Sequence, residues 1–158
     1  MSEKTLIRYG APTLAGLKTG SLFACPQEEY SRLCGSLRAI NRRLTPYGVR
    51  ILPLKKANGR VLAYLYRPDR LRRDLSDSHA QRILSARGYP VGDADRCLVT
   101  LARRLRSEAE FPHEVGLFLG YPPEDVSGFI SAGAKAAKCV GTWKVYGDVA
   151  AAQRTFAL

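Results

Sequence analysis

The chain lacks the features of a membrane-spanning or exported protein. No stretch approaches the ~18 consecutive apolar residues that a transmembrane helix requires. Its first residues place a glutamate beside a lysine, and no apolar segment of a signal peptide follows them. The 158 residues also contain no internal repeat, low-complexity tract or linker. We therefore expect one cytoplasmic domain, residues 1–158, with no membrane contact.

Residues that bind metals are sparse. The four cysteines, Cys25, Cys34, Cys97 and Cys139, form no C-x-x-C pair, whereas zinc sites usually draw their ligands from two such pairs. With only two histidines, a multi-histidine metal site within one chain is excluded. Cys34 and Cys97 fall on the apolar faces of predicted helices, where a free cysteine acts as a small hydrophobic residue. We expect four reduced thiols and no metal.

Positive charge is abundant. The formal net charge is +11, and arginines outnumber lysines by 18 to 7. Such a balance favours acidic partners: nucleic acid, anionic lipid, or a ligand with phosphate or carboxylate groups. A genome's base composition also explains an arginine bias, and the arginines are spread along helices instead of forming a basic tail. Both interpretations stay open.

The first half of the chain predicts a strand, a helix and a hairpin. Residues 11–26 suggest a loop or short helix and then a strand at 21–25, and Pro26 is a favourable helix start. Residues 49–55 and 60–67 are rich in branched and aromatic side chains around Asn58-Gly59, a preferred tight-turn pair. The helix before them ends at Pro46, and its apolar stripe comprises Tyr30, Leu33, Cys34, Leu37, Ile40, Asn41 and Leu44.

Residues 68–106 have a helical pattern that is interrupted at 88–90. Asp93 is a candidate N-cap for the last helix of this region. That helix presents an arginine-bearing face and an opposite apolar face. The arginines are Arg96, Arg103, Arg104 and Arg106, and the apolar residues are Cys97, Leu98, Leu101, Ala102 and Leu105.

The last third predicts a strand–helix–strand unit. Residues 114–119 are apolar on both faces, as in a central buried strand, and the turn at 120–125 leads into a helix. Residues 142–147 form the second predicted strand, parallel to the first, and 148–156 a closing helix. The fold class is therefore α+β or α/β, with a mixed sheet of about five strands covered by five or six helices and a C-terminal β-α-β unit.

Two stretches carry a family resemblance. The sequence FPHEVGLFLGYPPEDVSGFI at residues 111–130, together with WKVY at 143–146, resembles the signature of a bacterial family known only as a domain of unknown function. Weaker similarities at 14–18, 62–67 and 87–90 extend the resemblance over nearly the whole chain. It implies membership of that family and no particular activity.

Two apparent catalytic motifs are excluded. Residues 10–19 lack the spacing of a phosphate-binding loop, and no strand precedes them. Lys18-Thr19-Gly20 matches a triplet of penicillin-binding proteins, but no Ser-x-x-Lys accompanies it.

The turn Gly120-Tyr121-Pro122-Pro123 is the favoured ligand site. It follows a predicted parallel strand and opens a helix, the place where open α/β sheets bind ligands and where free N–H groups attract anions. The same residues support a purely structural interpretation. Both prolines lack an N–H, and the following Glu124 and Asp125 repel a phosphate.

His113, Glu114 and Tyr121 are the candidate catalytic residues. His113 is interpreted as a hydrogen-bonded structural residue, a general base or an axial ligand to haem iron. Adjacent residues on a strand point to opposite faces, so His113 and Glu114 do not easily act on one atom. The ligand-binding set expected around the turn is Gly120, Tyr121, Arg103, Arg104, Lys144 and Tyr146.

These observations favour a protein that binds an anionic small molecule or cofactor. The first alternative is a metal- or haem-linked enzyme that uses His113. The second is weak, non-specific nucleic-acid binding through the arginine-rich helix faces, disfavoured because no motif interleaves aromatic and basic residues. The sequence leaves the cofactor and the oligomeric state open.

Overall fold

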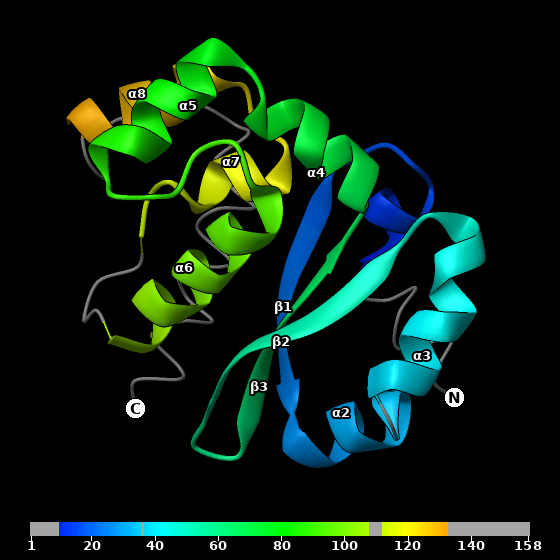
Figure 1. The fold of residues 1–158 in the computed structure, drawn as a ribbon. Helices are drawn as coiled ribbons and strands as arrows, with labels where there is room; N and C mark the ends of the chain where they lie inside the picture. The colour runs from blue at the N-terminus through cyan, green and yellow to red at the C-terminus, as the bar shows by residue number, and fades with distance from the viewer. Residues whose placement is uncertain (1–9, 36, 108–111, 133–158) are drawn as a thin grey trace.

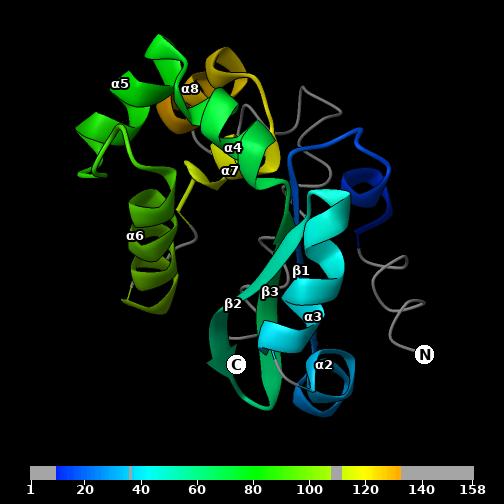
Figure 2. The same ribbon diagram turned by 45° about the vertical axis from the view of Figure 1, so that its right-hand side comes forward.

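A three-stranded antiparallel sheet lies between two layers of helices (Figures 1 and 2). The computed structural model describes residues 10–35, 37–107 and 112–132. The strand order is β1-β3-β2, so that β3 is central. Helices α2 and α3 cover one face of the sheet, and helices α4–α8 lie on the other side (Figure 2).

The predicted hairpin is confirmed. β2 (Arg50–Ala57) and β3 (Arg60–Tyr66) are antiparallel, and the two residues between them, Asn58 and Gly59, have φ angles of 52° and 74°. Two consecutive left-handed residues define the turn whose twist suits a two-residue hairpin. β1 (Gly20–Pro26) pairs with the other edge of β3, which confirms the predicted strand at residues 21–25.

Side chains of β3 alternate between two apolar cores. Val61, Ala63 and Leu65 enter the core beneath α2 (Gln27–Cys34) and α3 (Leu37–Leu44), together with Tyr30, Ile40 and Leu44 of these helices. The predicted single helix is thus two helices, because Gly35 follows α2 with a φ of 44°. A 3₁₀ turn, η1 (Thr45–Tyr47), ends this layer.

Asn41 fixes α3 to the sheet. Its Oδ1 accepts a hydrogen bond from the backbone N–H of Ile51 at 2.8 Å, and its Nδ2 donates to the Ile51 carbonyl at 3.1 Å. Ile51 lies on β2, which is an edge strand. The Asn41 side chain therefore occupies backbone groups with which another strand would otherwise pair.

The other core surrounds Leu62, Tyr64 and Tyr66 of β3. It is built by α4 (Pro68–Leu75), α5 (Ser78–Ala86), α6 (Ala94–Ser107), α7 (Val115–Leu119) and α8 (Pro123–Ala132). Asp93 accepts a hydrogen bond from the Arg96 N–H at 3.1 Å, which confirms it as a capping residue of α6. The predicted apolar face of α6 is also confirmed, because Cys97, Leu98, Leu101 and Leu105 are buried.

The predicted strand at residues 114–119 is wrong. Residues 115–119 form the short helix α7, and all five of these residues are buried. Because a short segment buried on every side has no apolar–polar alternation, it carries no periodicity that separates a strand from a helix. The remaining predicted strand at 142–147 and the closing helix at 148–156 lie outside the described residues. The α+β class is confirmed, with three strands instead of about five in the described part of the chain.

Gly20 allows β1 and α7 to approach each other. A Cβ atom at this position would lie 2.5 Å from Cε1 of Tyr64 and 2.7 Å from the carbonyl oxygen of Phe118. The Tyr64 hydroxyl donates to that same carbonyl, so neither group moves away without breaking a buried hydrogen bond.

Gly20→Ala is therefore expected to destabilise the protein by about 1–3 kcal/mol, the usual cost of overpacking a core. Gly128→Ala is the matched control, since Gly128 lies in α8 with no atom near its missing Cβ. Replacement of a helical glycine by alanine should leave stability unchanged or raise it slightly. Urea unfolding measures both, and equal stability of the two variants would contradict this account.

Candidate functional site

Glu114 is fully buried at the centre of an ion cluster whose two arginines, Arg87 and Arg104, are partly exposed. Arg87 Nε donates to its Oε1 at 2.8 Å, and the Tyr89 hydroxyl donates to its Oε2 at 2.7 Å. Arg104 Nε lies 3.0 Å from the same Oε2. Arg87 and Tyr89 follow α5, Arg104 is on α6, and Glu114 precedes α7. The cluster therefore ties together the segments that surround the second core.

The arginines of this cluster also support each other. Arg104 Nη1 donates to the Arg87 carbonyl at 2.8 Å, and the Arg104 guanidinium lies 5.7 Å from the centre of the Tyr89 ring. Burial alone raises the pKa of Glu114, but the hydrogen bonds from Tyr89 and Arg87 and the charge of Arg104 hold it below its ordinary value. The carboxylate is ionised and engaged on both oxygens, a geometry that suits an ion pair better than a general base.

The turn at Gly120 joins two helices. Gly120 ends α7 with a φ of 94°, and its backbone packs against Thr19, whose Oγ1 would lie 2.9 Å from a Cβ at this position. The Thr19 hydroxyl donates to Asp74 of α4. The turn is thus wedged between the start of β1 and α4, which requires a residue without a side chain.

The start of α8 offers little to an anion. The N–H groups of Asp125 and Val126 already donate to the Pro122 carbonyl, at 3.0 and 3.2 Å. Tyr121 is half-buried, and Lys18 Nζ lies 5.8 Å from the centre of its ring. Burial lowers the pKa of Lys18. Lys18 and Thr19 therefore lie against the predicted turn. No motif in the sequence had indicated this contact.

The predicted site residues separate into distinct environments. Glu114 and Arg104 are in direct contact, whereas Gly120 and Tyr121 lie beside Lys18 and Thr19. Arg103 is exposed on α6, and His113 is half-buried in the turn before α7. Lys144 and Tyr146 lie outside the described residues.

A cleft that the sequence did not reveal opens between the sheet and α4 and α6. It consists of two pockets that share Asp95, with volumes of about 230 Å³ and 300 Å³. We call it the Tyr66 cleft and define its polar groups as Arg50, Tyr66, Arg72 and Asp95. The apolar wall of the larger pocket comprises Leu52, Pro53, Leu54, Leu98, Val99 and Ala102.

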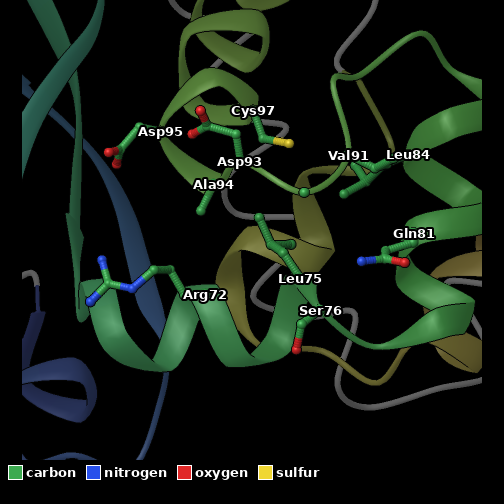
Figure 3. Close-up of a pocket in the computed structure, with 11 residues that line it drawn as sticks. Arg72, Leu75, Ser76, Gln81, Leu84, Val91, Asp93, Ala94, Asp95 and Cys97 are labelled. Atoms are coloured by element: carbon green, nitrogen blue, oxygen red, sulfur yellow. The ribbon is translucent and has the colours of Figure 1, made fainter.

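Figure 3 shows the smaller pocket from inside the helical layer. The guanidinium of Arg72 on α4 and the carboxylate of Asp95 on α6 lie on the same side of it, next to the strands. Leu75 and Ala94 line its interior, and the Gln81 amide borders it from α5. The pocket is therefore polar toward the sheet and largely apolar within.

Tyr66 links the charges of the cleft. It is 3% exposed and stacks on Tyr64, with ring centres 4.7 Å apart. Arg50 is its direct cross-strand partner on β2. Burial raises the pKa of Tyr66. The charges of Arg50 and Arg72 oppose that shift, and the charge of Asp95 adds to it. The net effect is a raised pKa, so the hydroxyl stays protonated and can donate a hydrogen bond at neutral pH.

Part of this cleft had a signal in the sequence. Tyr64 and Tyr66 are two residues apart on a predicted strand and so share one face. The two-residue turn alone would set Arg50 opposite Arg67, and a register shift between Pro53 and Lys55 brings it opposite Tyr66. Arg72 and Asp95 come from helices whose packing on that face depends on tertiary contacts. Only the shared face of the two tyrosines was therefore predictable.

Cys25 and Cys97 are buried and form no disulfide, as expected for two of the four thiols. Cys139 and the Cys34 side chain lie outside the part that the structure describes. Within that part, no group of three histidine, cysteine or acidic residues is arranged to hold a metal ion. No helix among residues 10–35, 37–107 and 112–132 is long and apolar enough to cross a bilayer.

The fold and the cleft define a small α+β protein with a polar-rimmed pocket between its sheet and its helices. The chain belongs to the family described as "Protein of unknown function (DUF3793)", whose model matches residues 6–158. This confirms the membership that residues 111–130 indicated. No curated protein and no solved structure matches the chain significantly.

Removal of the Glu114 charge should be strongly destabilising. Glu114→Gln leaves Arg87 and Arg104 without their buried counter-ion, which typically costs about 3–5 kcal/mol. Glu124→Gln, at an exposed position in α8, should change stability little. Urea unfolding at neutral pH compares the two, and a small effect of Glu114→Gln would show that the cluster is not a stabilising unit.

The pH dependence follows from the lowered pKa of Glu114. Its contribution to stability is complete above the unfolded-state pKa of ~4.3 and is lost as the pH falls through the lower folded-state value. The parent protein should therefore lose stability more steeply than Glu114→Gln in this acidic range. Parallel pH profiles of the two proteins would contradict the assignment.

Proposed function

We propose that this protein binds an anionic small molecule with an apolar part in the Tyr66 cleft. The observation that carries the proposal is that Arg50 and Tyr66 line one apolar pocket, which shares Asp95 with the adjoining pocket lined by Arg72. Concave sites with a few convergent polar groups are the usual places for small ligands.

Charge favours an anion. Arg50 is exposed and makes no ion pair with the carboxylates that the structure describes, while Arg72 pairs only with the highly exposed Asp69 on its own helix. A surface pair of that kind contributes little to stability, so a ligand displaces it at small cost. Guanidinium groups bind carboxylate and phosphate oxygens with strong, charge-assisted hydrogen bonds.

The remaining groups limit the ligand further. The apolar wall of the larger pocket favours a ligand with an apolar part. A pocket of about 300 Å³ suits a single ring. Asp95 repels a second negative group but accepts a hydrogen bond from a hydroxyl or an amine. We therefore infer a ligand with one anionic group, an apolar ring or chain, and a hydrogen-bond donor.

Calorimetric titration with phenyl phosphate and 4-hydroxybenzoate tests this function, with inorganic phosphate and phenol as partial probes. The anions that carry a ring should bind more tightly than either partial probe, because they use both the arginines and the apolar wall. Arg50→Gln and Arg72→Gln should each weaken binding at least about tenfold, the usual effect of losing a charge-assisted hydrogen bond.

Arg73→Gln is the matched control. Arg73 follows Arg72 on the same helix, is equally charged and exposed, and does not line the cleft. Its binding should stay within about twofold of the parent, since distant surface charges contribute little. If no ring-bearing anion binds, or if Arg72→Gln and Arg73→Gln behave alike, the proposed function is wrong.

A further inference from the structure

We propose that α3 and η1 form a binding surface for single-stranded nucleic acid. The surface, which we call the α3 face, consists of Arg38, Arg42, Arg43 and Tyr47. It belongs to the helical layer opposite the one that builds the Tyr66 cleft (Figure 2), so the two proposals stand on different residues.

The face belongs to a stretch of sequence that is free of acidic residues. Residues 30–68 contain nine arginines and lysines and no aspartate or glutamate. Most of the formal net charge of +11 therefore comes from this stretch. Since α3 and η1 themselves contain no carboxylate, their exposed charges are all positive, which favours a polyanion.

The fold directs this charge toward solvent. Ile40 and Leu44 of α3 are buried against the sheet, whereas Arg38, Arg42 and Arg43 are exposed. Arg38 and Arg42 are four residues apart and so lie on one side of the helix, with their Cβ atoms about 6 Å apart. They form a ridge that follows the helix axis.

Tyr47 adds an exposed aromatic ring to the charged surface. Its side chain is 74% exposed in the 3₁₀ turn that follows α3, four residues after Arg43. Arg67 Nη1 donates to the Tyr47 carbonyl at 3.1 Å, and Arg67 Nε donates to the Thr13 carbonyl at 2.8 Å, so the backbone beneath the ring is held. An exposed aromatic ring beside guanidinium groups is the arrangement on which unpaired bases stack.

The clamp between Asn41 and Ile51 makes the face rigid. It holds the backbone of α3 along the edge strand, and so the positions from which the arginines project. A preformed surface loses little conformational entropy when it binds.

The chemistry favours nucleic acid over a membrane. A helix that binds a lipid surface must insert its apolar face, and the apolar face of α3 is already buried in the core. The face also favours single strands over duplex, because the bases of a duplex are stacked on each other and do not reach Tyr47.

Fluorescence anisotropy with a labelled oligothymidylate of about 20 nucleotides tests the proposal, with binding measured over a salt series. The double variant Arg38→Gln/Arg42→Gln should reduce the slope of log K against log salt by about 1.4, the loss of two phosphate contacts on a single strand. Tyr47→Ala should weaken binding about fivefold to hundredfold at every salt concentration without changing the slope. Tyr47→Phe should restore it.

Two controls make the outcome decisive. Arg103→Gln/Arg106→Gln removes the same charge from α6 and should change affinity by less than about twofold. Arg72→Gln should leave oligothymidylate binding intact, whatever its effect in the cleft.

Four results would overturn the proposal. Binding that does not depend on Tyr47, or that weakens equally in both double variants, would indicate attraction by net charge alone. A preference for duplex DNA would exclude base stacking. Binding of phosphatidylserine vesicles through Arg38 and Arg42, with no oligothymidylate binding, would assign the face to membranes.

Discussion

The buried carboxylate of Glu114 constrains the whole helical layer on the second face of the sheet. A fully buried charge is tolerated only where its partners are fixed, and those partners come from the segment after α5, from α6 and from the start of α7. α6 therefore has one permitted position relative to the sheet. That position places Asp95, Leu98 and Val99 opposite Tyr66 and so shapes the cleft.

The structure divides the arginines by role. Several of them hold the fold, because their guanidinium groups donate to part-buried backbone carbonyls or to Glu114: Arg60, Arg67, Arg70, Arg87 and Arg104. A planar group with five donors suits this use better than the point charge of a lysine. The arginine bias thus has a structural explanation that neither base composition nor ligand binding provides. Arg38 and Arg42 on α3, and Arg50 and Arg72 at the cleft, are exposed to solvent, where they are accessible to anions.

Local signals predicted the elements that depend on local chemistry. The Asn58-Gly59 turn, the Asp93 cap and the apolar stripe of α6 each act within a few residues, so the sequence alone was sufficient. Residues 114–119 were misassigned because burial on all sides removes periodicity, and the break at Gly35 was missed because the apolar stripe continues through it. The sequence placed Glu114 and Arg104 among the candidates, but their contact depends on how α6 and α7 pack. The Tyr66 cleft needs side chains from four elements, and the sequence indicated only that Tyr64 and Tyr66 share one face of β3.

The alternation of side chains along strand β3 explains why the two proposed surfaces differ. Its alternate residues face opposite layers: Tyr64 and Tyr66 present polar aromatic groups to α4 and α6, whereas Val61, Ala63 and Leu65 present only apolar groups to α2 and α3. On the other face the helices seal the sheet completely, and their polar groups are left to solvent. Arg50 belongs to the same acid-free stretch as the α3 face but lies across from Tyr66, so the positive field that attracts a polyanion to α3 also contributes to anion binding in the cleft.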